Sequence, residues 1–185
     1  MIFSSFEFII FFVFFFIFIK FFPKFQYLTI ILGSLFFYSY WNPLFTTIII
    51  YLVLSAYLFS NIKLNLNISI IFILLPLLYF KYSYFFLVDI LNISNYLPKT
   101  FIYSGDLPLG ISFVTFTVIA LVIDSQKKVY LGSKKLLTIS SFILYFPQLI
   151  AGPILRGNQL VPLLSKKFLI NENNIKFGAT LFLIG

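Results

Sequence analysis

Leu107-Pro108-Leu109-Gly110-Ile111-Ser112-Phe113 opens a stretch that closes with Phe146-Pro147-Gln148-Leu149-Ile150-Ala151-Gly152-Pro153-Ile154-Leu155-Arg156. Both quoted segments are hydrophobic, but they carry Pro, Gly and small hydroxyl residues where a plain membrane anchor would carry Leu. Backbone that is not helical is tolerated in a bilayer only inside protein or along a water-filled cavity. The Pro-Gln and Gly-Pro pairs within apolar sequence therefore predict a built site rather than a simple anchor.

The composition of the whole chain predicts a polytopic, all-α membrane protein. Its 185 residues are 61% hydrophobic and only 10% charged, whereas ordinary soluble domains are roughly 45–50% apolar and about 25% charged. The excess is spread along the chain, and we expect about five to six transmembrane helices plus re-entrant or interfacial helices. The 28 Phe and 12 Tyr are elevated together with Ile, Lys and Asn, which favours an A/T-rich coding bias over a dedicated aromatic function.

The residue types that are missing exclude several kinds of chemistry. The chain has no Cys and no His, which excludes disulfides, thiolate metal sites, Cys nucleophiles and the commonest general base. The net charge of +8 comes from Lys residues that stand between hydrophobic segments, as the positive-inside rule predicts. We therefore expect the lipid bilayer as a partner, and neither nucleic acid nor a metal or cofactor.

Five hydrophobic segments are the expected spans: Met1–Ile19, Tyr27–Trp41, Leu44–Ser60, Ile68–Phe80 and Asp106–Ile123. The first reads as an uncleaved span, because Lys20 and Lys24 follow the apolar run. A tight turn is expected at Asn42-Pro43. The fifth span is expected to begin with Asp106 as N-cap and Pro108 in the first turn.

The segments between and after these spans are less regular. The run from Tyr82 to Leu91 is short and holds Asp89, which favours an interfacial or re-entrant helix, and 92–106 is loop-like. A polar loop with four Lys covers 124–135, Leu136–Ile150 is apolar again but meets Pro147, and 177–185 begins another apolar segment. We expect the whole of 1–185 to form part of a single domain.

The Lys residues also predict which way the chain is inserted. With the N-terminus outside, five spans place seven Lys on the cytoplasmic side, namely Lys20, Lys24, Lys63, Lys127, Lys128, Lys134 and Lys135. Only Lys81 and Lys99 then lie outside, and the opposite orientation would reverse this ratio. We therefore expect a multi-pass protein of the cytoplasmic (inner) membrane.

The fifth span supplies three candidates for a substrate cavity, which are Ser112, Thr115 and Asp124. Pro108, Ser112 and Thr115 are spaced i, i+4, i+7 and are expected on one helical face. Small hydroxyl residues on one face indicate either close helix packing or the lining of a pore or cavity. Asp124 ends this span, either as a solvated carboxylate among Lys residues or as part of the site.

The second quoted segment supplies Pro147, Gln148, Gly152, Pro153 and Arg156. Pro and Gly break helix geometry, Gln148 offers an amide, and Arg156 is a fixed cation. The segment is either a kinked helix end or a re-entrant turn that lines a polar cavity. The re-entrant turn fits the charges better, because it returns Arg156 and the following Lys residues to the cytoplasmic side.

These residues resemble the membrane-bound O-acyltransferase family. The bacterial branch that acetylates alginate or peptidoglycan, or serves teichoic-acid D-alanylation, is the nearest. Leu107–Phe113 with Ile123-Asp124 is similar to its Pro-Ile-Gly-Ile-Ser-Phe…Ile-Asp signature, and Phe146–Ile154 to its Phe-Pro-Gln-Leu-x-Ala-Gly-Pro-Ile signature. Met1–Ser5 together with Phe37–Pro43 resembles the first two spans of that branch more weakly. Val114 and Thr117 depart from the pattern where an aromatic and Gln are usual, and Ser125-Gln126 replace Val-Tyr.

The resemblance implies acyl transfer, acetyl in most of that branch, to a hydroxyl of peptidoglycan or an exported polysaccharide. It implies an acyl donor on the cytoplasmic side and an acceptor reached directly or through a partner extracytoplasmic acyltransferase. The family's catalytic His lies in a part that this chain does not match. We therefore expect an N-terminal fragment, inactive as an enzyme by itself. A transporter or channel-like protein with a re-entrant loop, and a non-catalytic membrane subunit, are the alternatives.

Overall fold

The computed structural model describes residues 5–62, 64–90, 107–152, 155–166, 168 and 171–184, and every regular element in these ranges is a helix. The all-α prediction is therefore confirmed. Among these residues no single helix is both long and apolar enough to cross a bilayer. One pair, Phe6–Phe21 with Pro23–Tyr40, passes on length and composition together, bent by 108° at the break between them.

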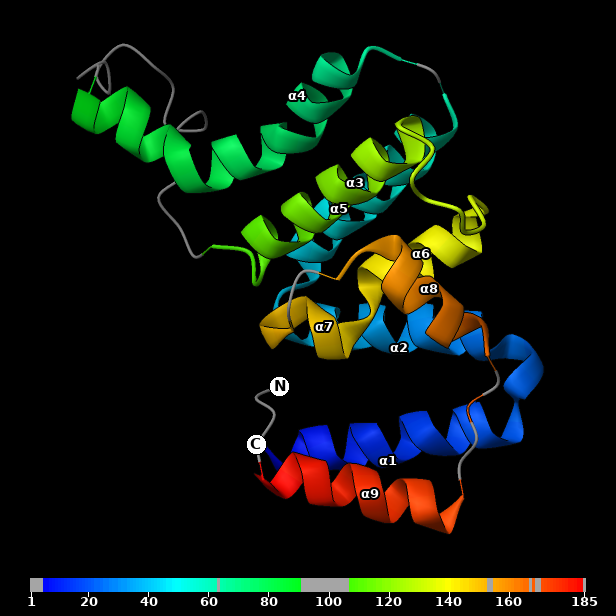
Figure 1. Ribbon diagram of the computed structural model, residues 1–185. Helices are drawn as coiled ribbons and strands as arrows, with labels where there is room; N and C mark the ends of the chain where they lie inside the picture. The colour runs from blue at the N-terminus through cyan, green and yellow to red at the C-terminus, as the bar shows by residue number, and fades with distance from the viewer. Residues whose placement is uncertain are drawn as a thin grey trace.

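The first half of the chain runs back and forth in four helices (Figure 1). They are α1 (Phe6–Phe21), α2 (Gln26–Trp41), α3 (Pro43–Asn61) and α4 (Leu66–Leu77), with the short 3-10 turn η1 (Pro23–Phe25) after α1. The predicted turn at Asn42-Pro43 is confirmed, because α2 ends at Trp41 and α3 begins at Pro43. Pro is well suited to a first helical position because its missing N–H would have no partner there.

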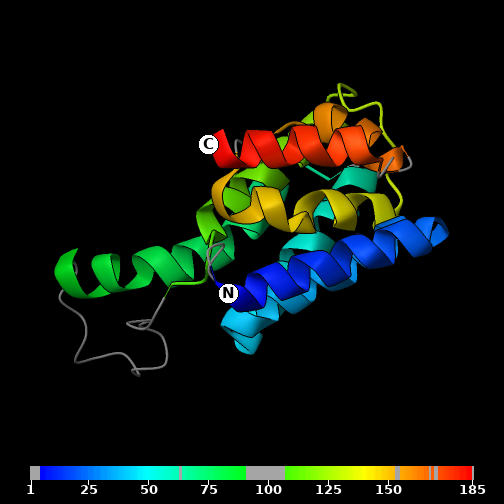
Figure 2. The same ribbon diagram turned by 90° about the horizontal axis from the view of Figure 1, so that it is seen from below.

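The second half contains five described helices, and α5 to α8 pack on one another or on the first half (Figures 1 and 2). They are α5 (Ile111–Gln126), α6 (Leu136–Leu144), α7 (Phe146–Ala151), α8 (Gly157–Ser165) and α9 (Glu172–Ile184). α5 packs on α3 and α4, α6 on α2 and α3, and α8 on α6. In α9, every side chain whose placement is described is exposed.

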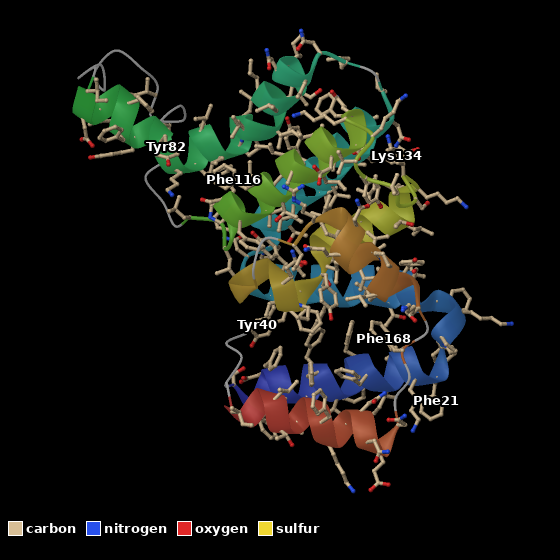
Figure 3. The ribbon with its side chains drawn as sticks, in the orientation of Figure 1. Phe21, Tyr40, Tyr82, Phe116, Lys134 and Phe168 are labelled. Atoms are coloured by element: carbon tan, nitrogen blue, oxygen red, sulfur yellow. The ribbon has the colours of Figure 1, made fainter. Side chains whose placement is uncertain are left out.

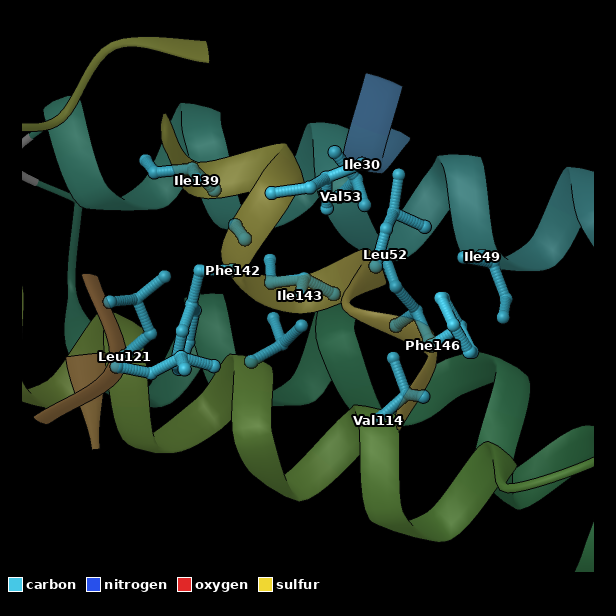
Figure 4. Close-up of a cluster of buried hydrophobic side chains, with 14 of the residues drawn as sticks. Ile30, Ile49, Leu52, Val53, Val114, Leu121, Ile139, Phe142, Ile143 and Phe146 are labelled. Carbon is cyan, nitrogen blue, oxygen red and sulfur yellow. The ribbon is translucent and has the colours of Figure 1, made fainter. Parts of the chain in front are cut away.

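The core lies between α2, α3, α5 and α6 (Figure 4). Its fully buried side chains include Ile30, Leu52, Val118, Ile139 and Phe142. Buried small polar residues lie at the same helix contacts: Ser55, Ser69, Thr115, Thr117, Ser140 and Ser141. Small side chains let helix backbones approach closely, so these positions build the helix packing.

Two helix boundaries differ from the sequence expectations. Tyr82 to Leu91 was expected to be an interfacial or re-entrant helix that follows the span Ile68–Phe80. The described part instead continues α4 without a non-helical residue through the π-type turns η2 (Leu78–Tyr82) and η3 (Phe85–Ile90). Leu78 to Ile90 is mostly apolar, like α4, and the helical backbone continues from α4 into it. The helical run bends where α4 and these turns meet (Figure 1).

The start of the fifth helix also differs from the expectation. The N-cap of α5 is Gly110, at φ 66° and ψ 13°, and Pro108 lies before the helix instead of in its first turn. The expected N-cap, Asp106, lies outside the described residues. A left-handed N-cap suits Gly, which has no Cβ to clash. Because Pro108 is not helical, it does not share a helical face with Ser112 and Thr115.

Candidate functional site

The predicted break near Pro147 is confirmed. α6 ends at Leu144, Tyr145 leaves helical geometry with φ −53° and ψ 100°, and α7 starts at Phe146. The first N–H groups of a helix have no partner within it. Here the buried N–H of Phe146 donates to Ser34 Oγ at 3.2 Å, Pro147 has no N–H, and the N–H of Gln148 donates to the Tyr145 carbonyl at 3.0 Å. The backbone groups at the break are therefore bonded inside the protein.

The ring of Phe146 anchors α7 among aromatic side chains of α1 and α2. Phe146 is 1% exposed, and its ring centroid lies 5.1 to 6.3 Å from those of Phe8, Phe11, Phe15 and Phe37. Aromatic pairs at such separations contribute about 0.5–1.5 kcal/mol each beyond their buried area. Phe146 and its four Phe neighbours therefore have a specific packing role, even where a coding bias raised the overall number of Phe residues.

The predicted residues Pro147, Gln148 and Gly152 lie in different environments. Pro147 is exposed, and the Gln148 side chain is buried at 6% exposure. Gly152 ends α7, and its N–H donates to the Gln148 carbonyl at 3.1 Å. A Cβ on Gly152 would lie 2.8 Å from the Gln148 Cα, so only Gly fits this close approach. Pro153 lies outside the described residues.

The start of α5 is shaped by a turn over Pro108–Ile111. The N–H of Ile111 donates to the Pro108 carbonyl at 3.2 Å, and Tyr38 Oη of α2 donates to the Leu109 carbonyl at 2.7 Å. Ser112 is half-buried in the first turn. Thr115 is fully buried, and its Oγ1 donates to the Ile111 carbonyl at 2.7 Å. This geometry favours the packing interpretation of Thr115 over the cavity-lining one.

Both quoted sequence segments therefore meet at one place in the fold. α7 packs against α5 and α2, and α2 bonds to the backbone at both helix starts. We call the residues 107–112 and 146–152 the signature cluster. It combines two broken-helix backbones with the buried Gln148 amide and the half-buried Ser112 hydroxyl.

Asp124 and Arg156 form a second group at the far end of α5. Arg156 Nη1 lies 3.8 Å from Asp124 Oδ1, with side-chain exposures of 67% and 13%. The sequence did not predict this pairing of two candidates. Between Ser112 and Asp124 the helix rises by about 18 Å, so the predicted candidates occupy two places and not a single pocket.

Hydrogen bonds around the loop 127–135 hold this second group in place. The N–H groups of Val129 and Tyr130 donate to the Asp124 carbonyl at 2.8 and 2.9 Å. Asn158 of α8 donates to the Val129 carbonyl at 2.7 Å and accepts from the Leu131 N–H at 3.0 Å. Arg156, which precedes α8, is therefore brought to Asp124 by the same loop that ends α5.

Lys134 connects the loop to the ends of two helices. Its Nζ donates to the carbonyls of Ser60 in α3 at 2.8 Å and Ser125 in α5 at 3.3 Å. Carbonyls in the last turn of a helix have no partner within it and carry partial negative charge. The ammonium group therefore caps both helices. Figure 3 shows Lys134 on the same side of the view, the right, as Phe168 and Phe21.

Tyr130 packs at the centre of this loop. Its hydroxyl donates to the Ser133 carbonyl at 3.0 Å, and a Cβ on Gly157 would lie 2.8 Å from its ring. Burial, and to a lesser extent the nearby Tyr27, raises the pKa of the Tyr130 phenol. The phenol is therefore neutral and acts as a hydrogen-bond donor at physiological pH.

Sequence reasoning missed three residues of α2 that bind these segments. Gln26, Ser34 and Tyr38 are 6%, 2% and 3% exposed, and each bonds to backbone far away in the sequence. Their spacing of i, i+8, i+12 on an apolar helix was the available signal, since such residues share one face. Within the described ranges, no group of three His, Cys, Asp or Glu residues could hold a metal ion.

The known proteins that are similar to this chain have names that describe O-acetylation of peptidoglycan or alginate. A peptidoglycan O-acetyltransferase of Helicobacter pylori is 28% identical over 88% of this chain and 37% of its own length. Proteins named probable alginate O-acetylase AlgI are 30% identical over 74% of the chain in Pseudomonas syringae pv. tomato and 41% identical over 45% of it in Pseudomonas aeruginosa. These alignments cover 29% and 16% of those proteins.

The chain thus spans at most 37% of the length of these relatives. No family model matches the sequence, and no solved structure matches the chain. The relatives nevertheless confirm the resemblance found in the sequence, because they carry the O-acetylating activities of that branch in their names.

Proposed function

We propose that this chain, a relative of the bacterial membrane-bound O-acyltransferases, takes part in transferring an acetyl group to a hydroxyl of peptidoglycan or an exported polysaccharide. The observation that carries the proposal is the alignment of 88% of the chain with a peptidoglycan O-acetyltransferase. The meeting of both signature segments on α2 supports it, because residues far apart in sequence form one cluster.

In this proposal the chain supplies the scaffold of the transfer site and not its general base. Acyl transfer to a hydroxyl needs a base for the attacking O–H and a stabiliser for the developing oxyanion. Residues 1–185 contain no His, so the base comes from outside them. Ser112, Gln148, Gly152 and Pro153 are the proposed contributors to the cavity. Asp124 with Arg156 forms a separate group, which we place at the cytoplasmic end of α5.

The arrangement of charges supports a cytoplasmic side for the acyl donor. Lys134 lies against the ends of α3 and α5, and Gln26, just after Lys24, donates to the carbonyls of Leu164 and Lys166 at 2.6 and 2.9 Å. The loops after α1 and α5 therefore carry Lys at one end of the molecule, as the positive-inside rule expects of a multi-pass inner-membrane protein. The acceptor then lies across the membrane, reached directly or through a partner extracytoplasmic acyltransferase.

The proposal is tested by deleting the gene in its native host and measuring O-acetyl esters on peptidoglycan and on exported polysaccharide. We expect loss of esters from one of the two, restored by the intact gene. Gln148→Ala and Arg156→Ala are expected to restore less ester than Leu131→Ala, a matched control because Leu131 is 87% exposed. Unchanged esters on both polymers after deletion would contradict the proposal.

The location of the base has its own test. Residues 1–185, expressed in a host without related enzymes, are expected to transfer no acyl group, because they hold neither His nor Cys. Robust O-acylation by this chain alone would refute the claim that the base lies elsewhere.

A further inference from the structure

One face of α2 carries a buried stripe of three hydrogen-bonding residues and one apolar residue. Gln26, Ile30, Ser34 and Tyr38 follow one another at intervals of four residues, and all are at most 6% exposed. Residues four apart lie above one another on a helix. The stripe therefore runs along the inner side of α2 from its first turn to its last.

Each polar member of the stripe bonds to backbone where another part of the chain begins or ends a helix. Gln26 receives the end of α8, through the carbonyls of Leu164 and Lys166 and the N–H of Phe168. Ser34 accepts from Phe146 at the start of α7, and Tyr38 donates to Leu109 before α5. These partners are separated from α2 by 71 to 142 positions in the sequence.

We propose that Ser34 and Tyr38 are positioning residues, which set the start of α5 against the start of α7 within the signature cluster. They stand one helical turn apart, so their Cα atoms are separated by about 6 Å along the helix axis. Each hydrogen bond is made to a backbone group. The two bonds therefore place the main chain before α5 and at the start of α7, whatever side chains these segments carry. The link to acyl transfer rests on the proposed function, while the positioning itself is a property of this chain.

If Ser34 and Tyr38 only stabilised the fold, replacing them would loosen the whole molecule evenly. If they position the signature cluster, replacing them affects that cluster first. The chain has no Cys, so spin labels can be placed at chosen pairs. Leu107→Cys with Pro147→Cys reports on the signature cluster, because both positions are exposed. Lys127→Cys with Leu163→Cys reports on the opposite end and serves as the reference pair.

Distance distributions of both pairs are measured in detergent or nanodiscs by pulsed electron paramagnetic resonance. Ser34→Ala and Tyr38→Phe are expected to broaden or shift the signature pair and leave the reference pair unchanged. Tyr40→Phe is the matched control on the same helix, since Tyr40 is 55% exposed. Unchanged signature distances, or equal broadening of both pairs, would overturn the inference.

The second readout is acyl transfer by the whole gene product without labels. Both variants are expected to lower kcat by about tenfold to a hundredfold, because small misplacements are costly for transfer, with KM for the acyl donor nearly unchanged. A kcat equal to wild type would show that the bonds do not position reacting groups. If the wild type transfers no acyl group, the proposed function fails, and the distance measurement alone decides whether Ser34 and Tyr38 position the cluster.

Discussion

Pro76 removes one hydrogen bond from within α4, and a single residue of α3, Tyr51, replaces it. Pro has no N–H, so the carbonyl four residues earlier, on Phe72, loses its helical partner. Tyr51 Oη of α3 donates to that carbonyl at 2.8 Å. Pro is tolerated within membrane helices when a neighbouring helix bonds to the carbonyl that it frees, and Tyr51 meets that requirement.

We expect Tyr51→Phe to destabilise the protein by about 1 kcal/mol, the net value of a typical hydrogen bond. In a Pro76→Ala background the backbone N–H returns, and the same substitution should cost less. The measurement is a double-mutant cycle of unfolding in detergent, with an expected coupling of at least about 0.5 kcal/mol. Additive effects would show that Tyr51 does not compensate for Pro76.

Two glycines allow a matched test of packing at residue level. A Cβ on Gly157 would lie 2.8 Å from the Tyr130 ring and 2.9 Å from Leu121 Cδ1, whereas a Cβ on Gly178 in α9 would meet nothing within 4 Å. We expect Gly157→Ala to cost about 1–3 kcal/mol by overpacking. Gly178→Ala should be neutral or stabilise by up to about 1 kcal/mol through helix propensity. Thermal unfolding followed by circular dichroism compares them, and equal melting temperatures would contradict the close packing at Gly157.

At the scale of elements, the ends of α3 and α5 depend on one ammonium group. Lys134 donates to carbonyls of both helices, and Asn61 adds a bond to the Lys134 carbonyl at 3.2 Å. Gln126 also donates to the Phe59 carbonyl at 3.3 Å. The two helices and the loop 127–135 are therefore expected to behave as one unit.

We expect Lys134→Met to destabilise the protein by about 1–2 kcal/mol, because it leaves two helix ends without their cation and donor. Lys135→Met is the control, because the Lys135 side chain is exposed and the substitution removes the same charge. Hydrogen exchange of residues 127–135 should accelerate in the first variant only. Equal acceleration in both would mean that net charge, and not capping, holds the loop.

At the scale of the whole molecule, the back-and-forth course of the helices and the gathering of Lys at one end favour a single orientation. Ser133→Cys in this Cys-free chain is expected to react with a membrane-impermeant thiol reagent only after the cells are opened, because the positive-inside rule predicts a cytoplasmic location for the Lys-rich loop 124–135. Cys substituted at Leu107, beyond the other end of α5, is the matched site for outside labelling. Labelling of Ser133→Cys in intact cells would overturn the orientation.

The sequence by itself determined the helical class, most helix positions and the break at Pro147. These follow from local causes: apolar composition, the lost N–H of Pro and the freedom of Gly. Local rules did not give the start of α5, because several positions from Asp106 to Gly110 were acceptable as the N-cap. They also did not give the end of α4, because the apolar run from Leu78 to Ile90 follows it directly.

Only the tertiary structure decided which distant residues meet. The pairing of Asp124 with Arg156, the capping of two helices by Lys134 and the bonds from the α2 stripe all join residues whose separation in sequence carries no distance information. Each depends on how far one helix is shifted and turned against another. That choice is made by packing across the core, where Phe146 among four other Phe rings fixes α7 and Thr115 lets α5 approach its neighbours closely.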